Sequence, residues 1–189
     1  MVGARIILVA QILLYSGLDP QTSPESRETV LVSNKTIMMG APLEWAYPPD
    51  IIICNTSDVE VSTAIRATEF WKKLGYKFGD IRVAERDDYI CAMGKPPLNQ
   101  ILIDIPSQGF QFGKHLGTTR TWHYTESSLA IRAKIEIVKG WGNAARVLEH
   151  EIGHAFGWRD NSKTGHIMNG SWSLSGLNSQ GLRKLEIPE

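Results

Sequence analysis

The residues whose types and spacing indicate chemistry lie in the segment 150–154, which reads His-Glu-Ile-Gly-His. On an α-helix, His150 and His154 lie one turn apart on the same face, so both imidazoles can reach one metal ion. Neutral imidazole is a good ligand for Zn²⁺, and Glu151 can hydrogen-bond a water on that ion and accept its proton. We therefore expect His150 and His154 to be zinc ligands and Glu151 to be the catalytic base.

Gly157 and Asp160 follow at intervals of three residues. Glycine readily adopts the left-handed conformation that ends a helix, and such a turn would bring residue 160 back toward the metal. A catalytic zinc typically has three protein ligands and one open position, so we expect Asp160 to be the third ligand. His166 is the alternative ligand, or else a residue that supports the ligands. With this composition, the extended pattern arises by chance in roughly one chain in twenty thousand.

Residues 150–160 resemble the long zinc motif of the metzincin metallopeptidases, with an aspartate third ligand similar to that of the snapalysin-like group. Met168, eight residues beyond Asp160, resembles the methionine that metzincins place in a tight turn beneath the zinc, at the spacing of the matrixins. The resemblance implies that Met168 packs below the imidazoles, and a thioether suits softer metals than zinc. It also implies the α/β (α+β) class, with a mixed, mostly parallel sheet, an active-site helix, the methionine turn and a C-terminal helix.

The expected function is that of a zinc-dependent endopeptidase, which hydrolyses a polypeptide substrate through a metal-activated water with Glu151 as the base. Two alternatives stay open. The first is a catalytically weak or inactive protein, in which zinc only holds the loop in place or supports peptide binding. It stays open because Asp160 lowers the net charge of the site. A zinc amidase acting on cell-wall peptides is the second, because it would use the same chemistry.

We expect one catalytic zinc ion, whereas calcium or a second zinc is not supported by the sequence. His115 and His123 are the histidines available for a matrixin-like second site, and residues 106–124 contain no acidic side chain. We interpret both histidines as ordinary polar residues. Glu149 points about 100° around the helix from its neighbour, so we expect it to be solvated or to support the ligands. Trp158 and Trp172 flank the motif and are interpreted as core or wall residues.

The elements that must position this site follow from periodicity. We expect strands near residues 29–32, 50–54, 80–84, 101–105, 118–124 and 130–138. A first helix should start at the capping box formed by Ser57 and Glu60 and end at Gly75. A second helix, over 143–156, should carry the zinc motif, and a last one should cover 179–185. By the resemblance, residues 118–124 form the edge strand that binds an extended peptide antiparallel.

Length and composition set the wider frame. The chain has 189 residues, with 20 Lys and Arg against 20 Asp and Glu, so charge does not favour nucleic-acid binding. No segment is long enough to span a membrane, and we expect a monomer. We interpret 1–17 as a signal or N-terminal hydrophobic segment, 18–49 as a linker or arm that is a candidate pro-segment, and 50–189 as the metallopeptidase domain.

Two further expectations leave alternatives open. The leader-like N-terminus favours a secreted or exported protein, with a cytoplasmic or virion-associated protein as the alternative. Cys54 and Cys91 are the two cysteines of the chain. A disulfide between them and two separate buried thiols are about equally compatible with the sequence.

Overall fold

The computed structural model describes residues 43–106, 115–124 and 127–170. The leader, residues 18–42 of the arm, the strand expected at 29–32, Trp172 and the last helix expected at 179–185 lie outside these ranges. Within them, no helix is long and apolar enough to cross a bilayer.

A mixed α/β fold with a mostly parallel sheet and few helices is observed, as the sequence predicts. The strands of the described region are β1 (Glu44–Trp45), β2 (Asp50–Cys54), β3 (Ile81–Ala84), β4 (Gln100–Asp104), β5 (Gly117–His123) and β6 (Leu129–Ile137). The helices are α1 (Val61–Lys72), α2 (Tyr89–Met93) and α3 (Val147–Ala155). The strands predicted between residues 50 and 138 agree with β2 to β6 to within one residue at each end.

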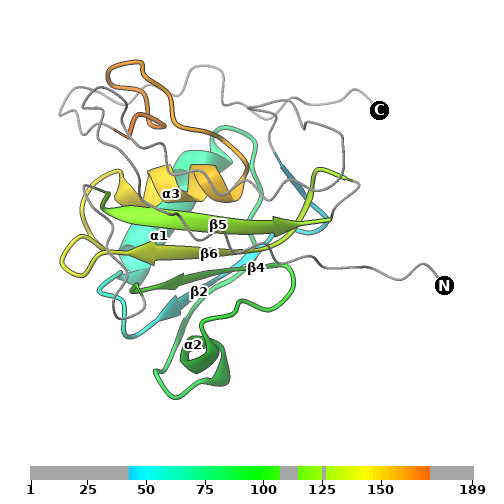
Figure 1. The fold of residues 1–189 in the computed structure, drawn as a ribbon, viewed down its shortest axis with the longest axis vertical. Coiled ribbons are helices and arrows are strands. Elements are labelled where there is room, and N and C mark those ends of the chain that lie inside the picture. The colour runs from blue at the N-terminus through cyan, green and yellow to red at the C-terminus, as the bar shows by residue number, and fades with distance from the viewer. Residues whose placement is uncertain (1–42, 107–114, 125–126, 171–189) are drawn as a thin grey trace, which may run out of the picture.

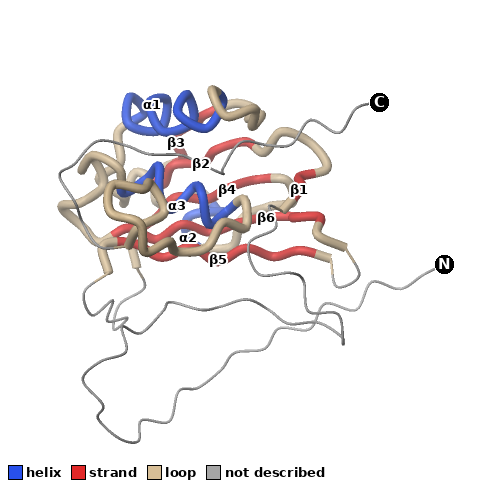
Figure 2. Tube along the Cα trace, turned by 90° about the horizontal axis from the view of Figure 1, so that it is seen from above, coloured by secondary structure: helices blue, strands red, loops and turns tan. Residues whose placement is uncertain are grey.

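The sheet has the order β1-β6-β4-β2-β3, and β5 pairs with β6. All pairs are parallel except β5 with β6, which is antiparallel. Figure 1 shows β5, β6, β4 and β2 side by side, with α3 next to β5. The two views together place α1 and α3 on one face of the sheet and α2 on the other (Figures 1 and 2).

The central strands β2 and β4 are apolar on both faces because both faces are covered, as is usual for parallel strands. Ile51 and Ile53 point toward α1 and α3 and join the main core, together with Trp71 of α1. Ile52 points to the opposite face and joins a small cluster with Leu102 beside α2. We call these two sides the α3 face and the α2 face.

A disulfide closes the α2 face. Cys54, at the end of β2, is bonded to Cys91 of α2, so the pairing that the sequence left open is formed in the structure. The short helix α2 was not predicted. Asp88 caps its first turn by accepting a hydrogen bond from the amide of Ile90, and Gly94 ends it in the left-handed conformation.

Both helices of the α3 face begin later than predicted, and Asn143 is involved in each case. The Ser57 hydroxyl bonds the Cys54 carbonyl instead of capping a helix, and α1 starts at Val61. The side-chain oxygen of Asn143 accepts hydrogen bonds from the Glu60 amide and from the hydroxyl of Thr63. Asn143 is therefore a cap for α1 and not the first residue of the zinc-motif helix, which begins at Val147.

Strand β1 lies within the last residues of the predicted arm, 18–49. It pairs with the start of β6, and the Trp45 indole donates to the carbonyl of Ala155 at 3.2 Å. Residues 44 and 45 are thus joined both to the sheet and to the end of α3.

Candidate metal centre

Helix α3 carries the histidines and is fixed to the rest of the protein by its apolar side. Leu148 and Ile152 are fully buried against the sheet and α1. The Trp71 indole of α1 donates to the carbonyl of Glu149 at 2.8 Å. This packing leaves the side chains of His150 and His154 partly exposed, at 16% and 19%, so both imidazoles are accessible from solvent.

The chain reverses immediately after α3. Gly157 has φ +83°, the left-handed conformation expected at this position. Its amide donates to the carbonyl of His154 at 2.9 Å, and the amide of Trp158 donates to the carbonyl of Gly153 at 3.0 Å. The turn returns the chain over the helix, and Asp160 comes to lie beside the two histidines.

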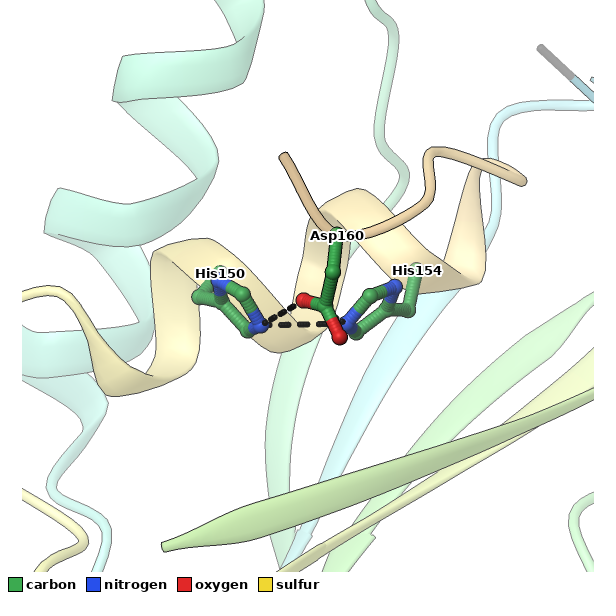
Figure 3. Close-up of side chains that lie close together, drawn as sticks. All are labelled: His150, His154 and Asp160. Carbon is green, nitrogen blue, oxygen red and sulfur yellow. Dashed lines mark hydrogen bonds and ion pairs between the residues drawn. The ribbon is translucent and has the colours of Figure 1, made fainter. Parts of the chain in front are cut away.

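Three donor atoms converge at this point, as Figure 3 shows. The Nε2 atoms of His150 and His154 are 3.0 Å apart. Oδ1 of Asp160 lies 3.2 Å from the first and 3.5 Å from the second. In the described part of the chain, these three residues form the one group of His, Cys, Asp and Glu side chains that can hold a metal ion.

The other nitrogen of each imidazole has a backbone partner. Nδ1 of His150 lies 2.8 Å from the carbonyl oxygen of Ile167, and Nδ1 of His154 lies 2.6 Å from that of Trp158. A carbonyl only accepts hydrogen bonds, so each Nδ1 carries a proton and donates it. In a neutral imidazole this leaves a lone pair on Nε2, the arrangement that metal-binding histidines usually have.

The cluster attracts a cation. Burial by itself would lower the pKa of His150, but the hydrogen bond to Asp160 and the nearby Glu151 carboxylate raise it above its usual value overall. Burial would likewise raise the pKa of Asp160, but hydrogen bonds from His150 and His154 hold it well below its usual range. Two lone pairs and a carboxylate facing one another need a positive charge between them, either a proton or a metal ion.

The spacing fits zinc. Zinc binds nitrogen and oxygen ligands at about 2.0–2.1 Å, so two ligands at a tetrahedral angle lie about 3.3 Å apart. The three observed separations, 3.0, 3.2 and 3.5 Å, scatter around that value. Two imidazoles and one carboxylate are also a ligand set known from catalytic zinc sites. His150, His154 and Asp160 thus fit the ion in both geometry and ligand chemistry.

Glu151 is buried between α3 and β5, with 5% of its surface exposed. Its Oε2 accepts a hydrogen bond from the Thr119 hydroxyl at 2.6 Å. Gly117, two residues earlier on β5, lies so close that a Cβ atom there would be 2.8 Å from Oε1 of Glu151. The carboxylate is therefore held against the strand next to the histidine pair.

Met168 lies beneath the helix and is fully buried. A Cβ atom on Gly153 would be 2.3 Å from its sulfur and 2.8 Å from a ring carbon of Trp71, so only glycine fits in that helical turn. His166 is also buried, and its Nδ1 accepts a hydrogen bond from the Met168 amide at 3.1 Å. His166 is thus part of the turn that contains Met168, whereas Asp160 joins the two histidines.

Of the two roles predicted for Glu149, a solvated side chain or a support for the ligands, the first is wrong. Glu149 is 5% exposed, and its Oε1 accepts a hydrogen bond from Nε of Arg66 at 3.0 Å. Helical geometry correctly directs it away from the metal site, but α1 covers that side of α3, so the carboxylate is paired with a neighbouring helix.

The remaining residues singled out in the sequence lie as follows. Trp158 packs against the main core and donates its indole N–H to the hydroxyl of Tyr76 at 2.8 Å. His123 is at the end of β5, where Nδ1 lies 3.1 Å from the carbonyl oxygen of Tyr124. His115 precedes β5, and neither His115 nor His123 belongs to the group of three residues that could hold a metal ion.

No protein-family model matches this chain, and no curated protein shows significant similarity to it.

Proposed function

We propose that this protein is a zinc-dependent endopeptidase of the metzincin type. The observation that carries the proposal is the convergence of three donor atoms within 3.0–3.5 Å, with both histidines anchored through Nδ1. Bound at His150, His154 and Asp160, a zinc ion would polarise the scissile carbonyl and acidify the attacking water.

Glu151 supplies the proton transfers. Its carboxylate accepts a proton from the water as the water oxygen forms a bond to the carbonyl carbon. It then donates that proton to the amide nitrogen, the carbon–nitrogen bond breaks, and one carboxyl and one amino terminus are released. Its place next to His150 on α3, with the carboxylate held by Thr119, supports this role.

The arrangement around the site supports a polypeptide substrate. Strand β5 is antiparallel to β6 and lies beside α3. The hydroxyls of Thr119 and Thr121 on β5 donate hydrogen bonds to backbone carbonyls of α3. An extended peptide pairing with β5 would have its backbone carbonyls near Glu151, and β-strand addition of this kind binds peptides through backbone hydrogen bonds. The turn at Gly157 and the buried Met168 further support the metzincin resemblance.

We also propose that the protein is exported. The Cys54–Cys91 disulfide supports this, because such bonds persist in oxidising compartments and are rare in the cytosol.

The test is hydrolysis by the zinc-loaded protein and by a Glu151→Gln variant. We expect wild type to cleave casein or a quenched peptide, chelation to abolish cleavage, and Glu151→Gln to retain zinc while kcat falls by a factor of about 10²–10⁴. Glu69→Gln is the matched control, because Glu69 is an exposed carboxylate of α1 paired with Lys72.

Three other results would redirect the assignment. Equal cleavage by Glu151→Gln and wild type would refute the role of Glu151. Zinc binding without any hydrolysis would favour the zinc-stapled structural or peptide-binding protein. Release of fragments from peptidoglycan, with casein untouched, would favour the amidase.

A further inference from the structure

We propose that Thr119 is a positioning residue for the base: its hydroxyl holds one oxygen of the Glu151 carboxylate and leaves the other to take the proton. This inference rests on the proposed function. It concerns a residue of the strand and not of the zinc motif, and the geometry around Glu151 carries it.

The hydrogen bond is short and connects two separate elements. Oγ1 of Thr119 on β5 lies 2.6 Å from Oε2 of Glu151 and 3.0 Å from the backbone oxygen of the same residue on α3. Hydrogen bonds to ionised groups are shorter and about twice as strong as neutral ones. The shorter of the two contacts, to the carboxylate, therefore fixes the rotation of the Glu151 side chain.

The second carboxylate oxygen of Glu151, Oε1, lies next to Gly117, where the missing side chain leaves room for it. Gly117 has no side chain where a Cβ atom would be 2.8 Å from Oε1 of Glu151 and 3.0 Å from its carboxyl carbon. Within the described part of the chain, Oε1 accepts no hydrogen bond. One oxygen is thus held by a hydroxyl, and the other lies over a glycine and stays available for proton transfer.

Strand β5 is suited to hold the hydroxyl in place. Gly117, Thr119 and Thr121 share the face of the strand toward α3, because side chains alternate, and Thr118 points to the opposite face. β5 pairs with β6 along seven residues. A threonine side chain has few allowed rotamers, so a strand fixed in this register aims the hydroxyl with little freedom.

Loss of the hydroxyl should therefore affect the chemical step and not substrate binding. A carboxylate free to rotate spends less time aligned with the attacking water, and small misplacements of a catalytic group lower rates strongly. We expect kcat of Thr119→Val to fall by about 10- to 100-fold, corresponding to one hydrogen bond to a charged group, with KM changed less than about twofold.

The experiment compares the zinc-loaded protein in five forms: wild type, Thr119→Val, Thr119→Ser, Gly117→Ala and Thr68→Val. Valine matches threonine in shape, and serine keeps the hydroxyl, so Thr119→Ser should recover kcat to within about threefold of wild type. Thr68→Val makes the same change at a buried hydroxyl of α1, which donates to the carbonyl of Ile65, and should leave kcat and KM unchanged. Zinc content and thermal midpoint are measured for each protein.

Gly117→Ala tests the same geometry with the hydroxyl intact. The backbone of Gly117 is open to alanine, since its φ is not positive. The added methyl would displace the Glu151 carboxylate, so kcat should fall as in Thr119→Val while zinc stays bound. This variant keeps the inference testable if Thr119→Val does not fold.

The outcomes separate this inference from the proposed function. If wild type cleaves peptides and Glu151→Gln does not, yet Thr119→Val is as fast as wild type, the positioning role alone is overturned. Equal kcat losses in Thr119→Val and Thr119→Ser, or a loss in Thr68→Val as large as that in Thr119→Val, would also overturn it. If zinc-loaded wild type hydrolyses no peptide, the proposed function and this inference fail together.

Discussion

The two faces of the sheet are stabilised in different ways. On the α3 face, nineteen buried residues from strands, helices and the methionine turn form the main core of the described region. On the α2 face, the buried apolar cluster has four residues, and the Cys54–Cys91 disulfide joins them to the short helix α2. Charged and polar side chains fill much of the rest, including the ion pair of Lys134 with Glu136.

This difference shows how the candidate metal site is kept in place. Every element that carries a proposed ligand or the base belongs to the α3 face and is fixed by burial and hydrogen bonds. The α2 face buries too little apolar surface to hold α2 by packing alone, and a covalent link compensates. Damage to the α2 face should therefore lower stability but leave the site intact.

The largest expected effect is a loss of unfolding free energy when the disulfide on the α2 face is reduced. Reduction of the Cys54–Cys91 bond removes a constraint that spans 37 residues, and loop entropy of that size corresponds to about 3–4 kcal/mol of unfolding free energy. We expect zinc-saturated wild type to lose about this much in chemical denaturation under reducing conditions. Zinc affinity of the reduced, folded protein should change less than about twofold.

The Cys54→Ala/Cys91→Ala double variant is the control, because its stability should not respond to the reductant. A fall in zinc affinity as large as the fall in stability would show that the two faces are coupled, contrary to this account.

A smaller effect is expected on the α3 face at high pH. Burial raises the pKa of Tyr76 to about 12, while the hydrogen bond from Trp158 lowers it slightly. Below pH 10 the tyrosine is protonated in both the folded and the unfolded chain, so its ionisation does not change the free energy of unfolding there. Between pH 10 and about 12, Tyr76 ionises in the unfolded chain but stays protonated in the folded one. The free energy of unfolding therefore falls by about 1 kcal/mol at pH 11.

Denaturation of wild type and Tyr76→Phe at pH 8 and pH 11 measures this effect. The variant should lose less stability than wild type over that interval by about 1 kcal/mol. An equal loss of unfolding free energy in both proteins would mean that ionisation of the Tyr76 hydroxyl does not contribute to the pH dependence of stability.

Local sequence was sufficient to predict that His150, His154 and Asp160 lie together. The spacing of His150 and His154, the glycine at 157 and the position of Asp160 depend on one helix and one turn. The strands between residues 50 and 138 were predicted to within one residue, and the compact apolar runs of β2 and β4 are the clearest of their signals. Asp88 and Gly94 also mark α2, but five residues between them give no periodicity to recognise.

Contacts between distant segments were not predictable in the same way. Ser57 and Glu60 look like a capping box, yet Asn143 takes that role from more than eighty residues away. Pairing of Cys54 with Cys91 depends on where α2 packs. The bond between Thr119 and Glu151 depends on the register of β5, which no local pattern determines.

The central claim is that His150, His154 and Asp160 hold one metal ion. Zinc titration of metal-free wild type tests it most directly, with Asp160→Ala beside it and Asp87→Ala, at an exposed carboxylate, as the matched control. The account predicts one zinc per chain and an affinity at least about 100-fold weaker for Asp160→Ala, since loss of a ligand exceeds the cost of losing a residue that only supports one. Undiminished zinc affinity in Asp160→Ala, or no binding by wild type, would contradict it.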